Sequence, residues 1–187
     1  MQEYFQDKKI WITGASSGIG KALAEELSKK GASLILSSRK LETLEVVKSG
    51  LENPDLCVLC PLDMEDDSAI DSVCNSLLKY HEIDIFILNA GISQRANASE
   101  TDLETEKKIM QTNYFGGIRM TKYILPQMKS RKSGHFVVMS SVTGKIGVPG
   151  RSSYAASKHA LIGYFDCLRA EEEDNGINVT TVCPGYI

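Results

Sequence analysis

The regular alternation of short apolar runs with longer amphipathic stretches most restricts how this 187-residue chain can fold. Runs rich in β-branched and other apolar residues predict strands, and the amphipathic stretches between them predict helices. The predicted strands cover residues 9–13, 33–38, 56–62, 83–89, 135–140 and 178–183. The predicted helices cover residues 18–30, 41–49, 65–80, 102–129 and 153–175. This order predicts repeated βαβ units in a single domain over residues 1–187.

The composition of the strands predicts how the sheet is covered. The run at 83–88 is apolar at nearly every position, so helices should cover both of its faces. Gly31 and Gly176 each stand where a helix should end and a strand begins, as left-handed glycines would allow. We therefore expect an α/β fold with a doubly wound, parallel, Rossmann-type sheet and helices on both faces.

A glycine-rich segment at residues 13–20, TGASSGIG, follows the first predicted strand and leads into the first predicted helix. Such a turn binds anions, because unpaired backbone N–H groups and the helix dipole both point at the ligand. Glycine is needed where a side chain would keep the phosphates or the helix away from the backbone. The segment predicts a dinucleotide pyrophosphate site with contacts from Gly14, Ser16, Ser17, Gly18, Ile19 and Gly20.

Two other motifs share part of this segment. A Walker A loop would need glycine at position 15 and serine or threonine at position 22, but both residues are alanine. The GxSxG nucleophile elbow of hydrolases fits residues 14–18 formally. Only one strand precedes it, so no upstream loop is left to form an oxyanion hole. A purely structural glycine turn stays open as an alternative.

The end of the second predicted strand bears on which dinucleotide is bound. An NAD site places a carboxylate there for the ribose 2′-hydroxyl, whereas arginine suits a 2′-phosphate. Residues 37–40 read Ser-Ser-Arg-Lys, so the acid is absent and Arg39 is present. We therefore expect NADP, used as NADPH. In the alternative interpretation, Arg39 and Lys40 are only solvated residues at a helix start.

Tyr154 and Lys158 are four residues apart near the start of the last predicted helix, so they share one helix face. A phenol with a pKa of about 10 is a poor base at neutral pH. An ammonium about 4 Å away, at an effective dielectric of about 20, favours phenolate by up to roughly 4 kcal/mol, or about three pKa units. A shift of that size suits general acid/base catalysis.

The spacing alone is not specific, because Tyr4 and Lys8 repeat it before the first predicted strand, where no catalytic partner is near. Tyr154 differs because Ser140-Ser141, at the end of the fifth predicted strand, brings a hydroxyl to the carboxyl edge of the sheet. Ligands bind at that edge in sheets of this type. The second tyrosine and lysine are therefore the candidate catalytic pair.

In chain order, these features resemble the signature of the short-chain dehydrogenase/reductase family. The resemblance covers essentially the whole chain and rests on residues 13–20, Asn89-Ala90-Gly91, Asn113, Ser141, Tyr154, Lys158 and Pro184-Gly185. It implies an oxidoreductase that transfers a hydride between NADP(H) and a small carbonyl or alcohol substrate. It also implies a homodimer or homotetramer.

The resemblance assigns a role to each matching residue. Ser141 would position and polarise the substrate carbonyl, and Tyr154 would give or take its proton. Lys158 would bind the nicotinamide ribose and lower the pKa of the tyrosine, while Asn113 would hold a water in a proton relay. Asp63 would face the adenine. The other cofactor contacts would come from Asn89, Ala90, Gly91, Pro184 and Gly185, besides Tyr154 and Lys158.

The chain departs from the family pattern in two places. The turn after the fourth predicted strand reads Leu88-Asn89-Ala90-Gly91, where a second asparagine is more usual. The sequence also reaches Ile187 soon after Pro184-Gly185, whereas similar proteins continue with a substrate lid, a helix and a seventh strand. We therefore expect a longer natural protein. A non-catalytic dinucleotide-binding sensor or scaffold is the second hypothesis, although the intact Ser141, Tyr154 and Lys158 favour the enzyme.

Composition argues against several other classes of protein. Lys and Arg total 21 against 24 Asp and Glu, so the net charge of −3 gives no basic surface for nucleic acid. No apolar run has the length of a signal peptide or of the roughly 20 residues that span a bilayer. These features predict a cytoplasmic protein with neither a nucleic-acid nor a membrane partner.

The five scattered cysteines indicate reduced thiols instead of a disulfide framework. Cys57 and Cys60 form a CxxC within a predicted strand, where an offset of three places the thiols on opposite faces. A second pair of Cys or His residues, needed to complete a metal shell, is not nearby in the sequence. We therefore expect no metal site.

Overall fold

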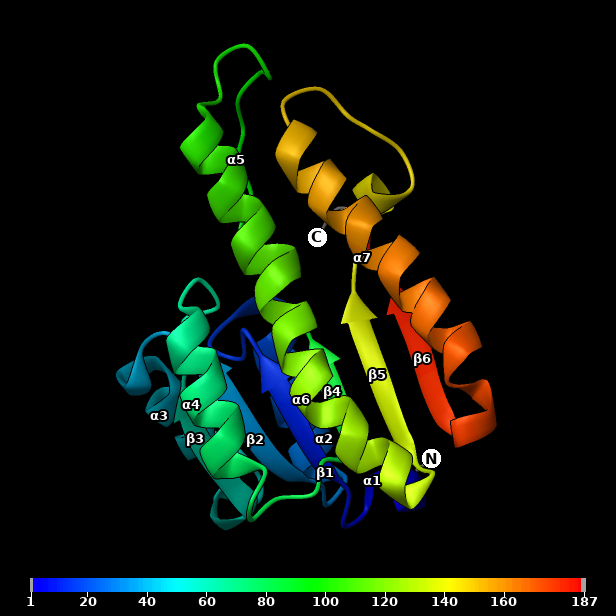
Figure 1. Ribbon diagram of the computed structural model, residues 1–187. Helices are drawn as coiled ribbons and strands as arrows, with labels where there is room; N and C mark the ends of the chain where they lie inside the picture. The colour runs from blue at the N-terminus through cyan, green and yellow to red at the C-terminus, as the bar shows by residue number, and fades with distance from the viewer. Residues whose placement is uncertain (1, 186–187) are drawn as a thin grey trace.

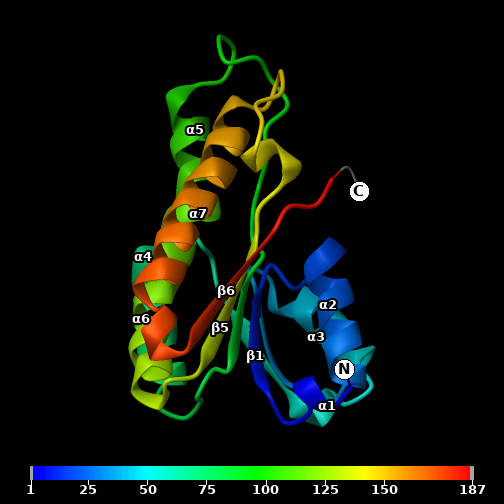
Figure 2. The same cartoon turned by 90° about the vertical axis from the view of Figure 1, so that its right-hand side faces the viewer.

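The computed structural model describes residues 2–185 as a six-stranded parallel sheet between two layers of helices (Figures 1 and 2). The strands are β1 (Lys9–Thr13), β2 (Ser33–Ser38), β3 (Cys57–Pro61), β4 (Ile85–Leu88), β5 (Gly134–Met139) and β6 (Ile177–Val182). Their order in the sheet is β3-β2-β1-β4-β5-β6, and every neighbouring pair is parallel. The predicted doubly wound, Rossmann-type fold is confirmed.

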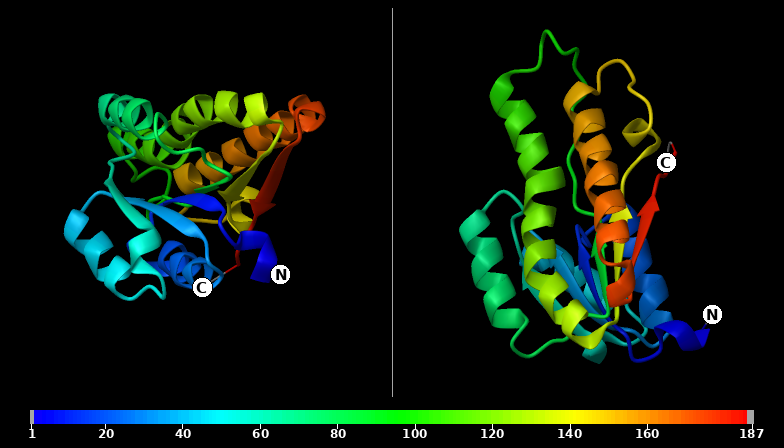
Figure 3. Two further views of the ribbon diagram at one scale, coloured as in Figure 1. Left: turned by 90° about the horizontal axis from the view of Figure 1, so that it is seen from below. Right: turned by 45° about the vertical axis from the view of Figure 1, so that its right-hand side comes forward.

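The helices divide between the two faces of the sheet, as Figure 2 and the view from below in Figure 3 show. One layer holds α2 (Gly18–Lys29) and α3 (Leu41–Ser49), and the other holds α4 (Asp67–Leu77), α5 (Leu103–Met110), α6 (Gly116–Arg131) and α7 (Ser152–Glu171). A short helix, α1 (Gln2–Phe5), precedes β1 and was not predicted from the sequence. The 3-10 turns are η1 (Pro54–Leu56), η3 (Val142–Gly144) and η4 (Glu173–Asn175).

Several predicted helix ends were wrong for local physical reasons. The helix predicted at 65–80 begins later, because the Asp66 side chain accepts a hydrogen bond from the Ala69 N–H at 2.9 Å and caps α4. The helix predicted at 102–129 is interrupted by the π-helical turn η2 (Gln111–Phe115) and continues to Arg131. Such turns carry an extra residue within a helix and are frequent at functional sites.

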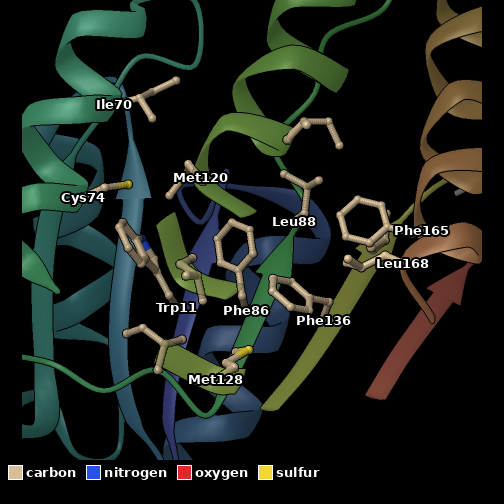
Figure 4. Packing of buried hydrophobic residues seen from close by; sticks show 14 of the residues in the cluster. Trp11, Ile70, Cys74, Phe86, Leu88, Met120, Met128, Phe136, Phe165 and Leu168 are labelled. Atoms are coloured by element: carbon tan, nitrogen blue, oxygen red, sulfur yellow. The ribbon is translucent and has the colours of Figure 1, made fainter. Parts of the chain in front are cut away.

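The core has one apolar cluster on each face of the sheet. On the face covered by α4, α6 and α7, Trp11 meets Phe86 edge to face at 6.0 Å, and Phe86 meets Phe136 in the same way at 6.2 Å (Figure 4). Cys60 belongs to this cluster, whereas Cys57 belongs to the cluster under α2 and α3. The two thiols therefore lie on opposite faces, as the strand spacing predicted.

The strand order reverses between β1 and β4, which places a crevice at their carboxyl ends. From β1 the chain proceeds outward to β2 and β3, and from β4 it proceeds the other way to β5 and β6. Gly31 and Gly176 have positive φ, of 78° and 70°, as predicted for glycines that end helices. Within residues 2–185, no helix combines the length and apolar character needed to cross a membrane.

Candidate active site

The glycine-rich segment after β1 is packed too closely for side chains at two of its glycines. Gly14 has a φ of 65°, and a Cβ added there would lie 2.8 Å from the Cα of Ala90. A Cβ on Gly20 would collide with the carbonyl oxygen of Gly14. The first turn of α2 therefore packs directly against the loop. Both glycines are required by close contact, and Gly14 is also required by its left-handed conformation.

The end of β4 is fastened to this loop by Thr13 and Asn89. The Thr13 hydroxyl accepts hydrogen bonds from the backbone N–H groups of Asn89, at 3.0 Å, and Ala90, at 3.1 Å. In return, the side-chain amide of Asn89 donates to the carbonyls of Thr13, at 3.0 Å, and Gly14, at 3.1 Å. Asn89 thus braces the loop through both of these carbonyls.

A cavity of about 380 Å³ opens beside this loop at the carboxyl ends of β1, β2 and β4. Its lining includes most of the residues predicted to contact the cofactor: Gly14, Ser16, Ser17, Arg39, Asp63, Asn89, Ala90 and Gly91. Ser38, Lys40 and Thr43 also line it beside Arg39, although the sequence did not single out Ser38 or Thr43. The other predicted contacts are absent from the lining: Gly18, Ile19, Gly20, Tyr154, Lys158, Pro184 and Gly185.

The residues outside the lining have identifiable places. Gly20 contacts the loop backbone, and Ile19 packs against the apolar cluster under α2. The Pro184 carbonyl accepts a hydrogen bond from the Val142 N–H at 3.0 Å, so this end of the chain lies beside η3. Asp63 is held at the cavity wall by a bond from the Glu65 N–H to its carboxylate at 3.0 Å.

The start of α2 at the cavity has the groups needed to bind a dinucleotide phosphate. Ser17 precedes α2 in an extended conformation, and its hydroxyl makes no capping hydrogen bond. Ser16 and Ser17 both line the cavity, so the start of α2 opens onto it. Free N–H groups and the positive end of the dipole at a helix start bind phosphate. The donor set therefore fits the group that the loop predicted.

Tyr154 and Lys158 lie together in the first turns of α7. The Lys158 Nζ is 5.7 Å from the centre of the tyrosine ring and donates a hydrogen bond to the Met139 carbonyl at 2.8 Å. Only 4% of the lysine is exposed, and burial lowers its pKa from 10.5 to about 8. A buried cation beside a half-buried phenol is an arrangement that supports proton transfer.

The structure distinguishes the two serines that end β5. Ser140 is buried, and its hydroxyl donates to the Lys158 carbonyl at 3.0 Å, so it is a structural residue. The Ser141 hydroxyl accepts hydrogen bonds from the N–H of Thr143, at 3.2 Å, and from its hydroxyl, at 3.0 Å. These two bonds fill its acceptor positions and leave its own proton for another acceptor.

Asn113 lies in the π-helical turn η2 and is fully buried. Its side chain accepts from the Ile92 N–H at 2.7 Å and donates to the Ile92 carbonyl and the Ser157 hydroxyl, both at 2.9 Å. Asn113 thus links the segment after β4 to α7 at Ser157, the residue before Lys158. This observed role is positioning, and the water-holding role implied by the resemblance stays a prediction.

The start of α7 is tied to the segment after β4 by Gln94, which the sequence analysis missed. The buried Gln94 side chain accepts a hydrogen bond from the Tyr154 N–H at 3.2 Å and donates to the Ser152 hydroxyl at 3.4 Å. It therefore satisfies a helix-start N–H that has no partner within the helix. No sequence signal marks this contact, because its residues are 60 positions apart.

Comparison with known proteins accounts for this arrangement. Residues 8–187 match the short chain dehydrogenase family. This chain belongs to that family. Oxidoreductases of this family bind a nicotinamide dinucleotide. Its glycine loop and its Ser141, Tyr154 and Lys158 set therefore stand in an oxidoreductase scaffold.

Similar proteins are found among curated relatives and among solved structures. The chain is 44% identical over 191 residues to dehydrogenase/reductase SDR family member 7B of Danio rerio, covering 97% of this chain and 62% of the relative. A short-chain dehydrogenase from Streptomyces avermitilis superposes with a TM-score of 0.92 at 34% identity, over 97% of this chain and 67% of that one.

The structure of ElxO with NADP bound superposes with a TM-score of 0.90 at 30% identity, covering 97% of this chain and 74% of that one. The family assignment therefore rests on both sequence and fold. The chain spans about three fifths of the length of the curated relatives it matches.

Proposed function

We propose that this short-chain dehydrogenase interconverts a carbonyl and an alcohol with NADP(H), using Tyr154 as the acid and base. The observation that carries the proposal is the buried Lys158 ammonium beside the Tyr154 ring, at the same sheet edge as the glycine loop. A buried cation is costly unless a carboxylate offsets its charge, and the observed partner of Lys158 is the neutral Met139 carbonyl. Its retention at 4% exposure therefore favours a functional role over a structural one.

In the reduction direction, bound NADPH would supply a hydride to the carbonyl carbon. Ser141 would donate a hydrogen bond to the carbonyl oxygen, because its acceptor positions are already filled by Thr143. Tyr154 would give its hydroxyl proton to the same oxygen as negative charge develops there. The nearby Lys158 charge would stabilise the phenolate left on Tyr154, and low solvent access strengthens that interaction.

The preference for NADP rests on the cavity wall after β2. Arg39 and Lys40 are exposed there beside Ser38 and Thr43, and the wall residues after β2 include no carboxylate. A 2′-phosphate is bound well by guanidinium and hydroxyl groups. Asp63 and Glu65 lie on the β3 side of the cavity, where the Asp63 carboxylate is engaged by a backbone N–H. The NADP-bound state of ElxO is consistent with this preference.

Steady-state oxidation of NADPH and of NADH against a panel of aldehydes and ketones tests the proposal. We expect turnover of at least one carbonyl and a kcat/KM for NADPH at least about 10-fold above that for NADH. Cofactor affinity should be measured in parallel by fluorescence titration. Tight NADPH binding without turnover of any carbonyl would instead support the dinucleotide-binding sensor.

A further inference from the structure

The arginines of this chain fall into two groups. Arg119, Arg131 and Arg169 each lie within 4 Å of a carboxylate, with Arg119 bonded to both Asp67 and Asp71. Among residues 2–185, no carboxylate forms such an ion pair with Arg39, Arg95 or Arg151. All three of these line cavities. Arg39 has a partner in the proposed 2′-phosphate, which leaves Arg95 and Arg151.

Arg151 lies immediately before α7 and against the proposed catalytic tyrosine. The carbon at the centre of its guanidinium is 5.8 Å from the centre of the Tyr154 ring. One guanidinium nitrogen, Nη1, donates to the Ser93 hydroxyl, which holds the side chain in place. A guanidinium has five N–H donors, so most of them remain for another partner. The positive end of the 20-residue helix α7 adds to the potential here.

A second hollow, of about 390 Å³, adjoins this position. Its lining is formed by Arg95, Ala96, Asn97, Glu100, Pro149, Gly150 and Arg151, from the segments that precede α5 and α7. The one carboxylate in this lining, Glu100, accepts a hydrogen bond from the Asn97 N–H at 3.2 Å. The two positive guanidinium groups and the one negative carboxylate leave the hollow with a net positive charge. This hollow is separate from the cofactor cavity and meets the site through Arg151.

We propose that the substrate carries an anionic group, a carboxylate or a phosphate, which the Arg151 guanidinium binds beside Tyr154. This inference rests on the proposed function and adds the class of carbonyl compound on which it acts. A guanidinium binds either anion through two parallel N–H bonds, which fixes orientation as well as affinity. Because Ser93 already holds Arg151, little side-chain freedom is lost on binding. Arg95 would add a second positive charge farther from the ring.

Matched pairs of aldehydes test this directly. The pairs are 4-formylbenzoate with its methyl ester, and 4-formylphenyl phosphate with 4-methoxybenzaldehyde. The measured quantity is the ratio of kcat/KM for the anionic compound to that for its neutral partner, so any general effect of a variant on turnover cancels. We expect the parent protein to favour the anion, and Arg151→Ala to lower the ratio by about 10- to 100-fold.

Two further variants sharpen the result. Arg151→Lys keeps the charge but loses the planar fork, so it should retain more of the preference for phosphate than for carboxylate. Lys79→Ala removes one positive charge from an exposed residue that follows α4, outside the lining of both cavities, and should leave the ratio unchanged. An equal fall with Lys79→Ala would assign the preference to overall charge and would overturn the proposal.

The failure of this inference is distinguishable from failure of the proposed function. Turnover of the neutral aldehydes with no preference for the anionic ones would keep the oxidoreductase and reject the anion site. If no aldehyde is turned over, calorimetric binding of 4-(hydroxymethyl)benzoate to the NADP-saturated protein still decides the inference. Binding that weakens about 10-fold or more in Arg151→Ala supports it, and equal binding overturns it.

Discussion

The two ends of the sheet each hold a tyrosine and a lysine four residues apart, but only the pair at the carboxyl end lies on one helix. At the amino end, α1 stops at Phe5 and Asp7 has a φ of 61°, so Tyr4 and Lys8 do not share a helix. Tyr4 is 55% exposed, and Lys8 is 3.8 Å from Asp84. At the carboxyl end, Tyr154 and Lys158 share α7. A spacing of four residues between tyrosine and lysine therefore brings the two side chains together only where both lie on one continuous helix.

The surroundings of the two lysine ammonium groups also differ between the pairs. The Lys8 ammonium is partly exposed and has a carboxylate nearby, so solvent and Asp84 both reduce its effect on a neighbour. The Lys158 ammonium is buried and bonded to a backbone carbonyl, which is neutral. Its charge therefore acts on the Tyr154 side of the site with little screening.

The largest expected effect separates the two tyrosines. Tyr154→Phe removes one hydroxyl, and we expect it to lower kcat by about 10³-fold while leaving NADPH affinity nearly unchanged, because the proton donor is lost. Tyr4→Phe removes the same group at the exposed end and should change neither quantity. Single-turnover kinetics and fluorescence titration measure the two effects. Equal kcat in Tyr154→Phe and the parent would refute the proposed mechanism.

A smaller effect is expected for Arg39, the cation proposed to bind the cofactor at the carboxyl end of the sheet. Arg39→Ala should weaken NADPH binding by about 10- to 100-fold and leave NADH binding within about twofold, because a charged hydrogen-bond donor to the 2′-phosphate is lost. Calorimetric titration with each cofactor measures both values. Lys79→Ala, at an exposed residue outside the cofactor cavity, is the charge-matched control. If NADPH affinity survives in Arg39→Ala, the basis for NADP preference is wrong.

The smallest effect concerns stability and distinguishes the two lysines. Burial lowers the pKa of Lys158 to about 8, below the 10.5 of the unfolded chain, so the unfolded state binds more protons between these values. The folding cost of the buried charge is therefore present below pH 8 and is relieved as the pH rises toward 10.5. Lys158→Met should stabilise the cofactor-free protein at pH 7 by about 1 to 2 kcal/mol, after the lost bond to Met139 is counted.

Denaturant unfolding at several pH values measures this effect. The parent should gain stability as the pH rises above 8, and that gain should be missing in Lys158→Met. Lys8→Met should retain the gain, since Lys158 is intact in it. A flat stability profile in the parent over this pH range would contradict the assigned burial cost.

The sequence predicted the sheet well because its strands are marked by local patterns. All six strand predictions agree with the structure to within two residues at each end, and Gly31 and Gly176 adopt the expected left-handed conformation. Parallel strands buried on both faces are nearly continuous apolar runs, and glycines mark where helices stop. Each of these patterns lies in the same short stretch of sequence as the strand or helix end that it predicts.

The parts of the site that escaped prediction are held by contacts between distant residues. Gln94 reaches the backbone of Tyr154, and no short pattern marks it. Asn113 was identified by resemblance, but its bonds to Ile92 and Ser157 were not predicted. The π-helical turn that carries Asn113 was also missed, because its residues have ordinary helix spacing. Ser140 and Ser141 could be separated only by resemblance until their different hydrogen bonds were seen.

The bonds between Thr13 and Asn89 also constrain the order of events as the chain is made. These residues are 76 positions apart, and the paired residues of β1 and β4, such as Ile10 and Ile85, are 75 positions apart. At about 5 to 20 residues per second, a ribosome needs roughly 4 to 15 s to extend the chain from one to the other. During that interval the glycine loop lacks its brace, and one edge of β1 is open to incorrect pairing. While the segment from β1 to β4 is being synthesised, the nascent chain therefore needs protection from aggregation.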